Sequence, residues 1–272
     1  MLTCGRHEVI DARGLRLRLH HWGMPGDAPV LLLHSMGAHG HWWDWTAPFL
    51  AGTRHVVALD FRGHGESGRP EPPAYDFAHH VADALAALDV LGWTAPLVIG
   101  HSLGGYIGAS LAATHPERVG RLVIADMLTS WTEDMAARGR EQAARAPQRL
   151  ASAAEVAARF RLTPPETGAP AEWLRHLGEA GAVERSSGAW EAAFDRRALL
   201  HPPIDPWPAL PAVRCPTLVV RGEHSPLMDR AQMLRVATTV HSGKFAEIPG
   251  AYHHLVLDDP PAFAAVVERW LS

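Results

Sequence analysis

The chain has 272 residues, of which 47% are hydrophobic and 20% are charged, and its formal net charge at pH 7 is −4. A chain of this length can bury the core of one large domain. Neither sign of charge forms a long block, which argues against a nucleic-acid-binding surface. The longest apolar runs, residues 30–33 and 217–220, have the length of strands and fall far short of the roughly 20 residues that cross a bilayer. The first residues contain no apolar signal segment, so we expect a cytoplasmic protein that binds neither membrane nor nucleic acid.

Two cysteines, Cys4 and Cys215, lie far apart in the sequence and in no Cys-x-x-Cys pattern. This spacing argues against a disulfide framework and against a zinc site. We therefore expect both residues to be buried thiols without a chemical role.

Short apolar runs alternate with longer helical patterns in the first half of the chain, as in a parallel sheet with crossover helices. An alternating pattern predicts a half-exposed strand over residues 16–20, after a turn at residues 12–14. Near-continuous apolar runs then predict strands that are buried on both faces. These runs are residues 30–33, 56–59, 97–99 and 122–125. Between the second and third of them, apolar residues recur with helical spacing from Val81 to Leu88 and predict a crossover helix.

After Ala125, no strand-like run follows until Thr217. The intervening patterns are helical, and prolines interrupt them. They predict helices over residues 131–145, 151–160, 173–180 and 189–193. A strand, a helix, a short strand and a final helix follow over residues 217–220, 231–237, 245–248 and 261–271. The sequence therefore predicts an α/β core of residues 1–127 and 205–272 that is interrupted by an all-helical insertion of residues 128–204.

A serine lies in the sequence Gly100-His101-Ser102-Leu103-Gly104, directly after a predicted buried strand and directly before a predicted helix. This is the G-x-S-x-G pattern of a nucleophile elbow, in the strand-turn-helix context that the elbow requires. Glycines suit so tight a turn because they carry no Cβ atom. We expect Ser102 to lie at the carboxyl end of its strand as a nucleophile, where the N-terminus of the helix favours developing negative charge. The alternative is an accidental glycine-rich turn.

A serine hydroxyl is a weak nucleophile, so a base must lie within hydrogen-bonding reach of it. The chain has 18 histidines. His253 follows the last short strand, in the sequence Pro249-Gly250-Ala251-Tyr252-His253, and precedes the final helix. This places it on a loop at the carboxyl edge of the sheet, and we interpret it as the base. The neighbouring His254 is expected to pack, and His101 is expected to point away from the site.

These two motifs, together with His34-Ser35-Met36-Gly37 and the segment DFRGHGES at residues 60–67, occur in the order and spacing of a capped serine esterase or lactonase of the α/β-hydrolase fold, which the chain resembles. The resemblance implies a mostly parallel sheet of eight strands with helices on both faces. It also implies that the insertion is a helical cap after the sixth strand.

The resemblance further implies an oxyanion hole of two backbone N–H groups. One belongs to Leu103, directly after the nucleophile, and the other to Met36, with Ser35 as the alternative. Each such donor is typically worth about 10²- to 10³-fold in turnover. Ser35 stands where a glycine commonly follows the histidine in this family, and its hydroxyl is a candidate third donor.

The acid that orients the base has three candidates. In many relatives an aspartate follows the seventh strand, where this chain has Ser225, and serine cannot carry the charge that stabilises an imidazolium. Other members of the fold take the acid from the end of the sixth strand, which here is followed by Asp126. We favour Asp126, with Asp229 and Glu223 as the alternatives. Asp126 could instead cap the first helix of the insertion.

Large aromatic residues in the insertion supply more apolar area than short helices can bury among themselves. Some of them should face the Ser102 cleft, which predicts a substrate with an apolar or aromatic part. The residues expected to line this pocket are His34, Ser35, Trp43, Trp131, Trp173 and Trp190. The paired histidines at positions 20–21, 39–41 and 79–80 have no carboxylate or cysteine at ligand spacing, so we expect no metal site and no cofactor.

Together these residues predict a serine hydrolase that forms an acyl-enzyme on a carboxylic ester or lactone of a small, partly apolar molecule. In this mechanism His253 accepts the Ser102 proton, the two N–H groups hold the oxyanion, and Asp126 orients the imidazole. Hydrolysis of a thioester or a C–C bond and acyl transfer on the same triad are alternatives, as is a small-molecule receptor with little turnover. The sequence leaves open whether the protein is a monomer or a homodimer.

Overall fold

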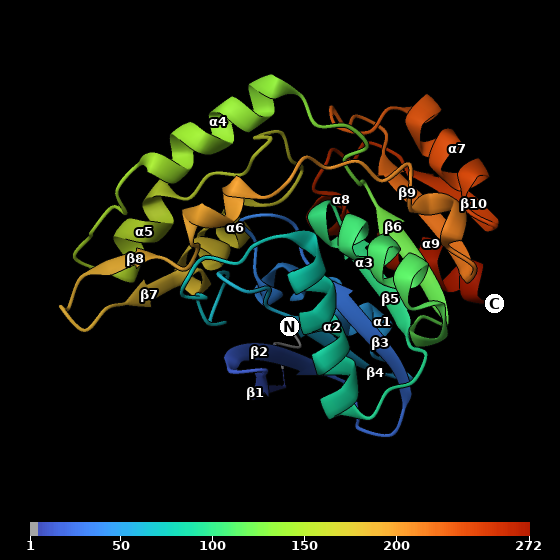
Figure 1. Ribbon diagram of the computed structural model, residues 1–272, viewed down its shortest axis with the longest axis horizontal. Coiled ribbons are helices and arrows are strands. Elements are labelled where there is room, and N and C mark those ends of the chain that lie inside the picture. Colours follow the sequence, from blue (N-terminus) through green and yellow to red (C-terminus); the bar gives the residue numbers. More distant parts are fainter. Residues whose placement is uncertain (1–4) are drawn as a thin grey trace.

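The computed structural model describes residues 5–272, so Cys4 lies outside the described residues. Its centre is a sheet of eight strands in the order β1-β2-β4-β3-β5-β6-β9-β10 (Figure 1). β2 pairs antiparallel with β1 and with β4, and the other pairings in this sheet are parallel. The mostly parallel eight-stranded sheet expected from the sequence is confirmed.

The core elements cover the predicted strands and helices and extend them by a few residues. The strands are β1 (Arg6–Ala12), β2 (Leu15–Trp22), β3 (Ala28–Leu33), β4 (Arg54–Leu59), β5 (Leu97–His101), β6 (Arg121–Ala125), β9 (Pro216–Gly222) and β10 (Ser242–Ile248). The helices are α1 (Ala47–Leu50), α2 (Phe77–Leu91), α3 (Leu103–Thr114), α7 (Arg230–Thr239), α8 (Leu255–Asp258) and α9 (Pro260–Leu271), with 3₁₀ turns η1 (Gly40–Trp43), η2 (Pro116–Arg118) and η4 (Leu210–Ala212). The sequence analysis did not predict β1, because this strand at the edge of the sheet is mostly exposed and has no apolar run.

Each face of the sheet has its own hydrophobic core. Leu31 and Leu33 of β3 pack in one cluster with apolar residues of α2, α3 and α7. Val30 and Leu32 point to the opposite face and pack with α1, α8 and α9. All four side chains are fully buried. Because helices cover both faces, the central strands carry apolar residues at several consecutive positions, which is why they appear in the sequence as continuous runs.

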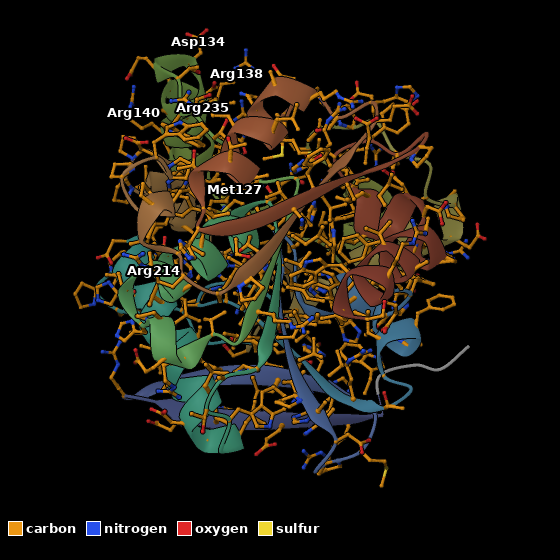
Figure 2. All side chains as sticks on the ribbon, turned by 90° about the vertical axis from the view of Figure 1, so that its right-hand side faces the viewer. Met127, Asp134, Arg138, Arg140, Arg214 and Arg235 are labelled. Atoms are coloured by element: carbon orange, nitrogen blue, oxygen red, sulfur yellow. The ribbon has the colours of Figure 1, made fainter. Side chains whose placement is uncertain are left out.

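The insertion lies over the end of the sheet at which the parallel strands finish, at the upper left of Figure 1. It contains α4 (Glu133–Ala144), α5 (Ala153–Arg159), α6 (Ala171–Ala180), β7 (Ala182–Glu184), β8 (Trp190–Ala192) and η3 (Arg196–Leu200). The Asp195 N–H donates to the Gly63 carbonyl over 2.7 Å and so fastens the insertion to the loop after β4. Figure 2 shows Asp134, Arg138 and Arg140 of α4 at the outer surface, and all three side chains are exposed.

The prediction of an all-helical insertion is wrong at one place. Residues 189–193, expected to be helical, instead contain β8, which pairs antiparallel with β7. The turn between them has Gly188 at a φ of 78°, a conformation that favours glycine. Each strand has only three residues, which is too short for an alternating apolar pattern to be recognised.

Two smaller expectations can be compared with the structure. Cys215 is buried and free, and burial raises the pKa of its thiol, as expected for a cysteine without a chemical role. Among the described residues, no helix combines the length and the apolar character that crossing a bilayer requires.

The turn from β5 into α3 depends on close backbone contacts at two glycines. A Cβ atom on Gly104 would lie 2.1 Å from the Leu33 carbonyl oxygen, and one on Gly100 would lie 2.1 Å from the Gly104 carbonyl oxygen. Backbone atoms at such distances cannot move aside without disturbing the sheet. The two glycines of the G-x-S-x-G pattern therefore let α3 begin directly against the ends of β3 and β5.

We expect Gly104→Ala to destabilise the fold by about 2 kcal/mol or more, because the new methyl group overpacks a rigid backbone contact. Gly108→Ala, in the same helix, is the matched control, since its Cβ would meet the ends of side chains and no backbone atom, with Leu122 Cδ1 at 3.1 Å and Val98 Cγ1 at 3.4 Å. Its effect should stay within about 1 kcal/mol, in part because alanine favours helix. Urea denaturation followed by circular dichroism measures both. Equal stability of the two variants would contradict this account of the turn.

Candidate active site

Ser102 occupies the turn between β5 and α3 in a strained conformation, with φ 54° and ψ −114°. A positive φ is uncommon for a residue with a side chain and is typical of functional turns. The Ser102 N–H donates to the Ala125 carbonyl over 2.8 Å, which ties the turn to the end of β6. The serine is therefore held at the carboxyl edge of the sheet, in the strand-turn-helix context expected of a nucleophile elbow.

Asp126 directly follows β6, the strand beside β5, and it also has a positive φ, of 47°. Its side chain is fully buried. The carboxylate accepts from the Gly222 N–H over 3.0 Å, from the Ser225 hydroxyl over 2.6 Å and from His253 Nδ1 over 2.8 Å. A buried carboxylate needs such donors, because burial removes its water. Asp126 thus joins β9 and the His253 loop to the end of β6.

The other two candidate acids have different surroundings. Asp229 directly precedes α7 as its N-cap. Its carboxylate accepts from the Gln232 N–H, and the Gln232 side chain accepts from the Asp229 N–H, which together form a capping box. Glu223 is exposed and accepts from the Gly250 N–H over 2.8 Å. The helix-capping alternative for Asp126 is wrong, because Thr132 caps α4. Of the three acids, Asp126 is the one that the structure brings to His253.

His253 is buried, and contacts on both sides of its loop fix its position. A carboxylate oxygen only accepts hydrogen bonds, so Nδ1 of His253 carries the hydrogen that is shared with Asp126, and Nε2 keeps a lone pair. His101 Nε2 donates to the His253 carbonyl over 2.8 Å. A Cβ atom on Gly222 would lie 2.0 Å from the Tyr252 carbonyl, so the loop packs directly on β9.

The expectation that His101 points away from the site is wrong. Its ring lies beside that of His253, with 4.9 Å between the ring centroids. Burial holds the pKa of His101 well below its ordinary value, and His253 lowers it further. A neutral imidazole has a single N–H donor, and here that donor holds the backbone of His253. His254 packs as expected, with Nε2 on the Pro164 carbonyl at 2.8 Å.

The loop after β3 is fixed by His34. The Phe61 N–H donates to His34 Nε2 over 3.0 Å, so Nδ1 carries the hydrogen and donates to the Ser35 carbonyl over 2.7 Å. Burial lowers the pKa of His34 to about 3, which keeps the ring neutral. Since a trans peptide points its C=O and N–H in opposite directions, the Met36 N–H faces away from this buried ring. The Ser35 hydroxyl donates to the Met36 carbonyl over 3.3 Å and is not a free third donor.

Asp60, in the segment of residues 60–67, connects this loop to the core. Its carboxylate accepts from the Gly40 N–H over 2.5 Å and from the Glu66 N–H over 2.9 Å. Burial alone would raise the pKa of Asp60, but the His20 ring beside it holds this pKa well below its usual range. The segment therefore positions the loop that carries Met36.

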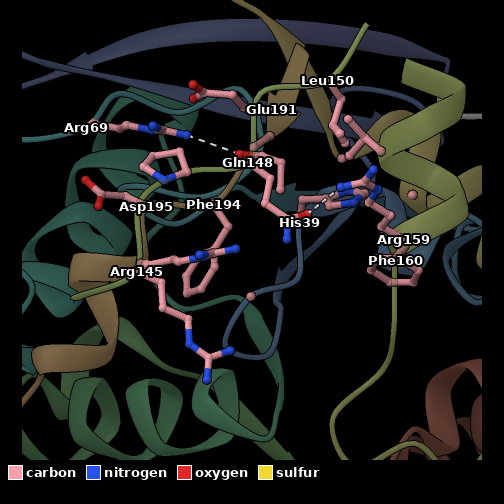
Figure 3. Close-up of a pocket in the computed structure, with 18 of the residues that line it drawn as sticks. His39, Arg69, Arg145, Gln148, Leu150, Arg159, Phe160, Glu191, Phe194 and Asp195 are labelled. Carbon is pink, nitrogen blue, oxygen red and sulfur yellow. Dashed lines mark hydrogen bonds between the residues drawn. The ribbon is translucent and has the colours of Figure 1, made fainter. Parts of the chain in front are cut away.

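A cavity of about 440 Å³ lies between the insertion and the core. Its core wall includes Gly37, which follows Met36, and also His39 and Arg69 (Figure 3). Five arginines and two acidic residues line it, namely Arg69, Arg145, Arg159, Arg196, Arg197, Glu191 and Asp195. Both acids already form ion pairs, Asp195 with Arg197 and Glu191 with Arg185. The cavity therefore carries an excess of positive charge.

The residues that line this cavity include neither the six residues expected to line the substrate pocket nor Ser102, Asp126 and His253. His34, Ser35 and Trp43 are buried in the core. Trp173 stacks on Trp45, with 4.5 Å between the ring centroids. Trp131 packs on His201, and Trp190 bridges to Leu150 within the insertion. One aromatic residue of the insertion, Phe194, lines the cavity together with the charged residues. The positions of these charged residues depend on how the insertion docks on the core, which could not be inferred from the sequence.

The family model of the alpha/beta hydrolase fold matches residues 28–260. The chain therefore belongs to the alpha/beta hydrolase family, as the sequence motifs indicate.

Among individual relatives, "Putative carbamate hydrolase RutD" of Caulobacter vibrioides is 38% identical over 111 residues, which are 41% of each chain. The "2-hydroxymuconate semialdehyde hydrolase" of Pseudomonas sp. (strain CF600) is 38% identical over 118 residues, 42% of this chain and 41% of the relative. These matches span about two fifths of the relatives' length. The solved structure of E-2-(acetamidomethylene)succinate hydrolase superposes with a TM-score of 0.83, covers 98% of both chains and is 22% identical, a likeness of fold.

We expect stability to fall as the pH is lowered from about 6.5 toward 4, because buried neutral histidines resist protonation. Burial, and to a lesser extent the neighbouring His253, lower the pKa of His254 to about 4. The unfolded chain takes up this proton near the ordinary value of 6.5, so acid favours unfolding. Urea unfolding at pH 7.5 and pH 5 measures the loss.

His254→Gln keeps a donor for Pro164 and removes the titrating group. Its loss of unfolding free energy between pH 7.5 and pH 5 should be smaller than that of the wild type by about 2 kcal/mol. His224→Gln, at an exposed histidine, is the matched control and should keep the wild-type loss. The same loss in all three proteins would contradict the assignment.

Proposed function

We propose that the protein is a serine hydrolase that forms an acyl-enzyme on Ser102 and acts on a carboxylic ester or lactone. The observation that carries this proposal is the hydrogen bond of 2.8 Å between Asp126 and His253, at the sheet edge where Ser102 occupies its strained turn. Hydrolase activity on this fold is common to the family to which the chain belongs.

In the proposed mechanism, His253 Nε2 takes the proton from the Ser102 hydroxyl as its oxygen attacks the substrate carbonyl. The backbone N–H groups of Leu103 and Met36 hold the oxyanion. Leu103 begins α3, and the first N–H groups of a helix have no partner within the helix, so they are available to an anion. The tetrahedral intermediate then collapses: its C–O bond to the alcohol breaks, and the protonated His253 gives its proton to the departing oxygen, which becomes a free alcohol or, from a lactone, the hydroxyl of the acyl chain. The neutral His253 next takes a proton from water, whose oxygen attacks the acyl-enzyme and releases the acid, and the proton returns to Ser102.

Ser225 strengthens the case for an enzyme over a receptor. The absence of an aspartate at this position is the feature of the sequence that favours a receptor. In the structure the Ser225 hydroxyl donates to Asp126 Oδ1, the oxygen that also accepts from His253. Ser225 thus supports Asp126, an acid that follows a different strand, β6. A serine at position 225 is therefore compatible with a complete catalytic triad.

We infer that the substrate carries an anionic group in addition to an apolar part, and that this group reaches the cavity at Gly37, the residue after Met36. Arg69 is the best placed to bind it, since within residues 5–272 its guanidinium forms no ion pair and its one hydrogen bond is to the Ala192 carbonyl, at 3.3 Å. Burial lowers the pKa of Arg69, and the nearby Arg185 lowers it further. A carboxylate of the substrate would relieve this excess of positive charge through a charge-assisted hydrogen bond.

The first test is the intact mass of the wild type and of Ser102→Ala after treatment with a fluorophosphonate probe. We expect one adduct on the wild type and none on the variant, because the probe labels only a serine that a base activates. Turnover of a p-nitrophenyl ester by the same two proteins gives a second measurement. An adduct on both proteins, or on neither, would count against the proposal.

Asp126→Asn should lower ester turnover by about 10³- to 10⁴-fold, because asparagine cannot stabilise the imidazolium. Asp229→Asn is the matched control, since Asp229 caps a helix, and its turnover should stay within a few-fold of the wild type. Steady-state kinetics on one ester compares them. The reverse pattern would assign the acid to Asp229.

Arg69→Met should lower kcat/KM for an ester with a free carboxylate on its acyl chain by about 10-fold or more. The kcat/KM for a neutral ester of equal length should change little. Arg138→Met, at the exposed outer face of α4, should change neither value. An equal loss on both esters would mean that Arg69 supports the structure and does not read the substrate's charge.

A further inference from the structure

Three potential metal ligands meet where the insertion touches the core, outside the catalytic site. His41 Nδ1 and His176 Nε2 lie 3.0 Å and 2.8 Å from the same oxygen of Asp44, Oδ2. The three ligand atoms all lie within 4.8 Å of one another. His41 belongs to η1 and Asp44 follows it, whereas His176 belongs to α6 of the insertion. The cluster therefore spans two segments that are far apart in the sequence.

Asp44 has a carboxylate oxygen that accepts no hydrogen bond from any residue in the range 5–272. Its side chain is about nine-tenths buried, and Oδ1 has no partner among the described residues. An unsatisfied buried carboxylate oxygen is costly, and in native proteins it often marks the place of an ion or water.

The surroundings form a rigid joint that would hold such a site. Trp45, next to Asp44, stacks on Trp173 of α6 with 4.5 Å between centroids and an interplanar angle of 11°. The Trp45 ring also contacts the His176 ring, at 5.3 Å. One helical turn beyond Trp173, the Leu177 carbonyl accepts a hydrogen bond from His39 Nε2 over 3.1 Å. Aromatic packing thus fixes the ligands on both sides of the joint.

We propose that His41, Asp44 and His176 bind a divalent transition-metal ion of the Zn²⁺ class, which fastens α6 of the insertion to the core. Two imidazoles and one carboxylate form a ligand set that zinc accepts in tetrahedral geometry, with bonds of about 2.0 to 2.2 Å and a fourth position open to water. Ligand atoms at such bond lengths lie about 3.3 Å apart, close to the spacing found between Asp44 and the two rings. His176 is half-exposed, so the fourth position has access to solvent.

Binding is measured by titrating Zn²⁺ into untagged, chelator-treated, full-length protein in a calorimeter. We expect one ion per chain in the wild type and an affinity lower by about 10-fold or more in His176→Gln. The exposed position of His176 lets this variant fold, which circular dichroism checks, and Asp44→Asn is a second variant. His79→Gln is the matched control: His79 also lies against a carboxylate three residues away, Asp76 at 2.7 Å, but without a third ligand, so Zn²⁺ binding should be unchanged.

A second readout is the melting temperature, which Zn²⁺ should raise in the wild type and in His79→Gln but not in His176→Gln. No saturable binding to the wild type would overturn the proposal. Equal affinity in the wild type and His176→Gln would also overturn it and would direct attention to His101, His253 and His254, the other histidine cluster. Neither readout depends on catalysis, so a failed hydrolase assay and a failed metal titration are separate results.

Discussion

The buried carboxylate of Asp126 is the constraint on which the site depends. A carboxylate without water must receive hydrogen bonds from the protein, and here the donors come from β9, from the loop after β9 and from the loop of His253. Satisfying one charge therefore sets the relative positions of three segments. It also fixes the tautomer of His253, since the hydrogen on Nδ1 leaves the Nε2 lone pair available as a base.

Much of the catalytic edge could be predicted from the sequence, because it depends on local chemistry. A serine between glycines, after an apolar run and before a helix, has few other structural explanations. The choice of Asp126 was harder, since Ser225 occupies the position at which relatives carry the acid. The structure explains the pair together, because the serine donates to the aspartate. Such complementary positions cannot be found from one sequence, as the two residues lie far apart in it.

The insertion was less predictable, for a physical reason. Its helices are short and separated by prolines, so their docking depends on contacts between segments and not on a strong pattern in any one of them. The sequence analysis expected some tryptophans of the insertion to face the Ser102 cleft, which stays a prediction. It could not foresee that Trp173 stacks on Trp45 of the core or that arginines line the cavity between the insertion and the core. Similarly, the candidate metal site could not be recognised in the sequence, because the third ligand, His176, reaches Asp44 only when α6 docks on η1.

In the proposed mechanism, the two parts of the protein have different tasks. Groups that could make and break bonds lie on the rigid carboxyl edge of the sheet, where the chain holds Ser102 and Asp126 in strained conformations. Groups that could select a substrate come mainly from the insertion, which rests on the core through the Trp45–Trp173 stack and through His39. The cavity wall includes Gly178 of α6 and Gly181, which directly follows α6. Any ligand that holds α6 against η1 therefore also fixes one wall of the cavity, so a metal ion at His176 would stabilise the shape of the cavity.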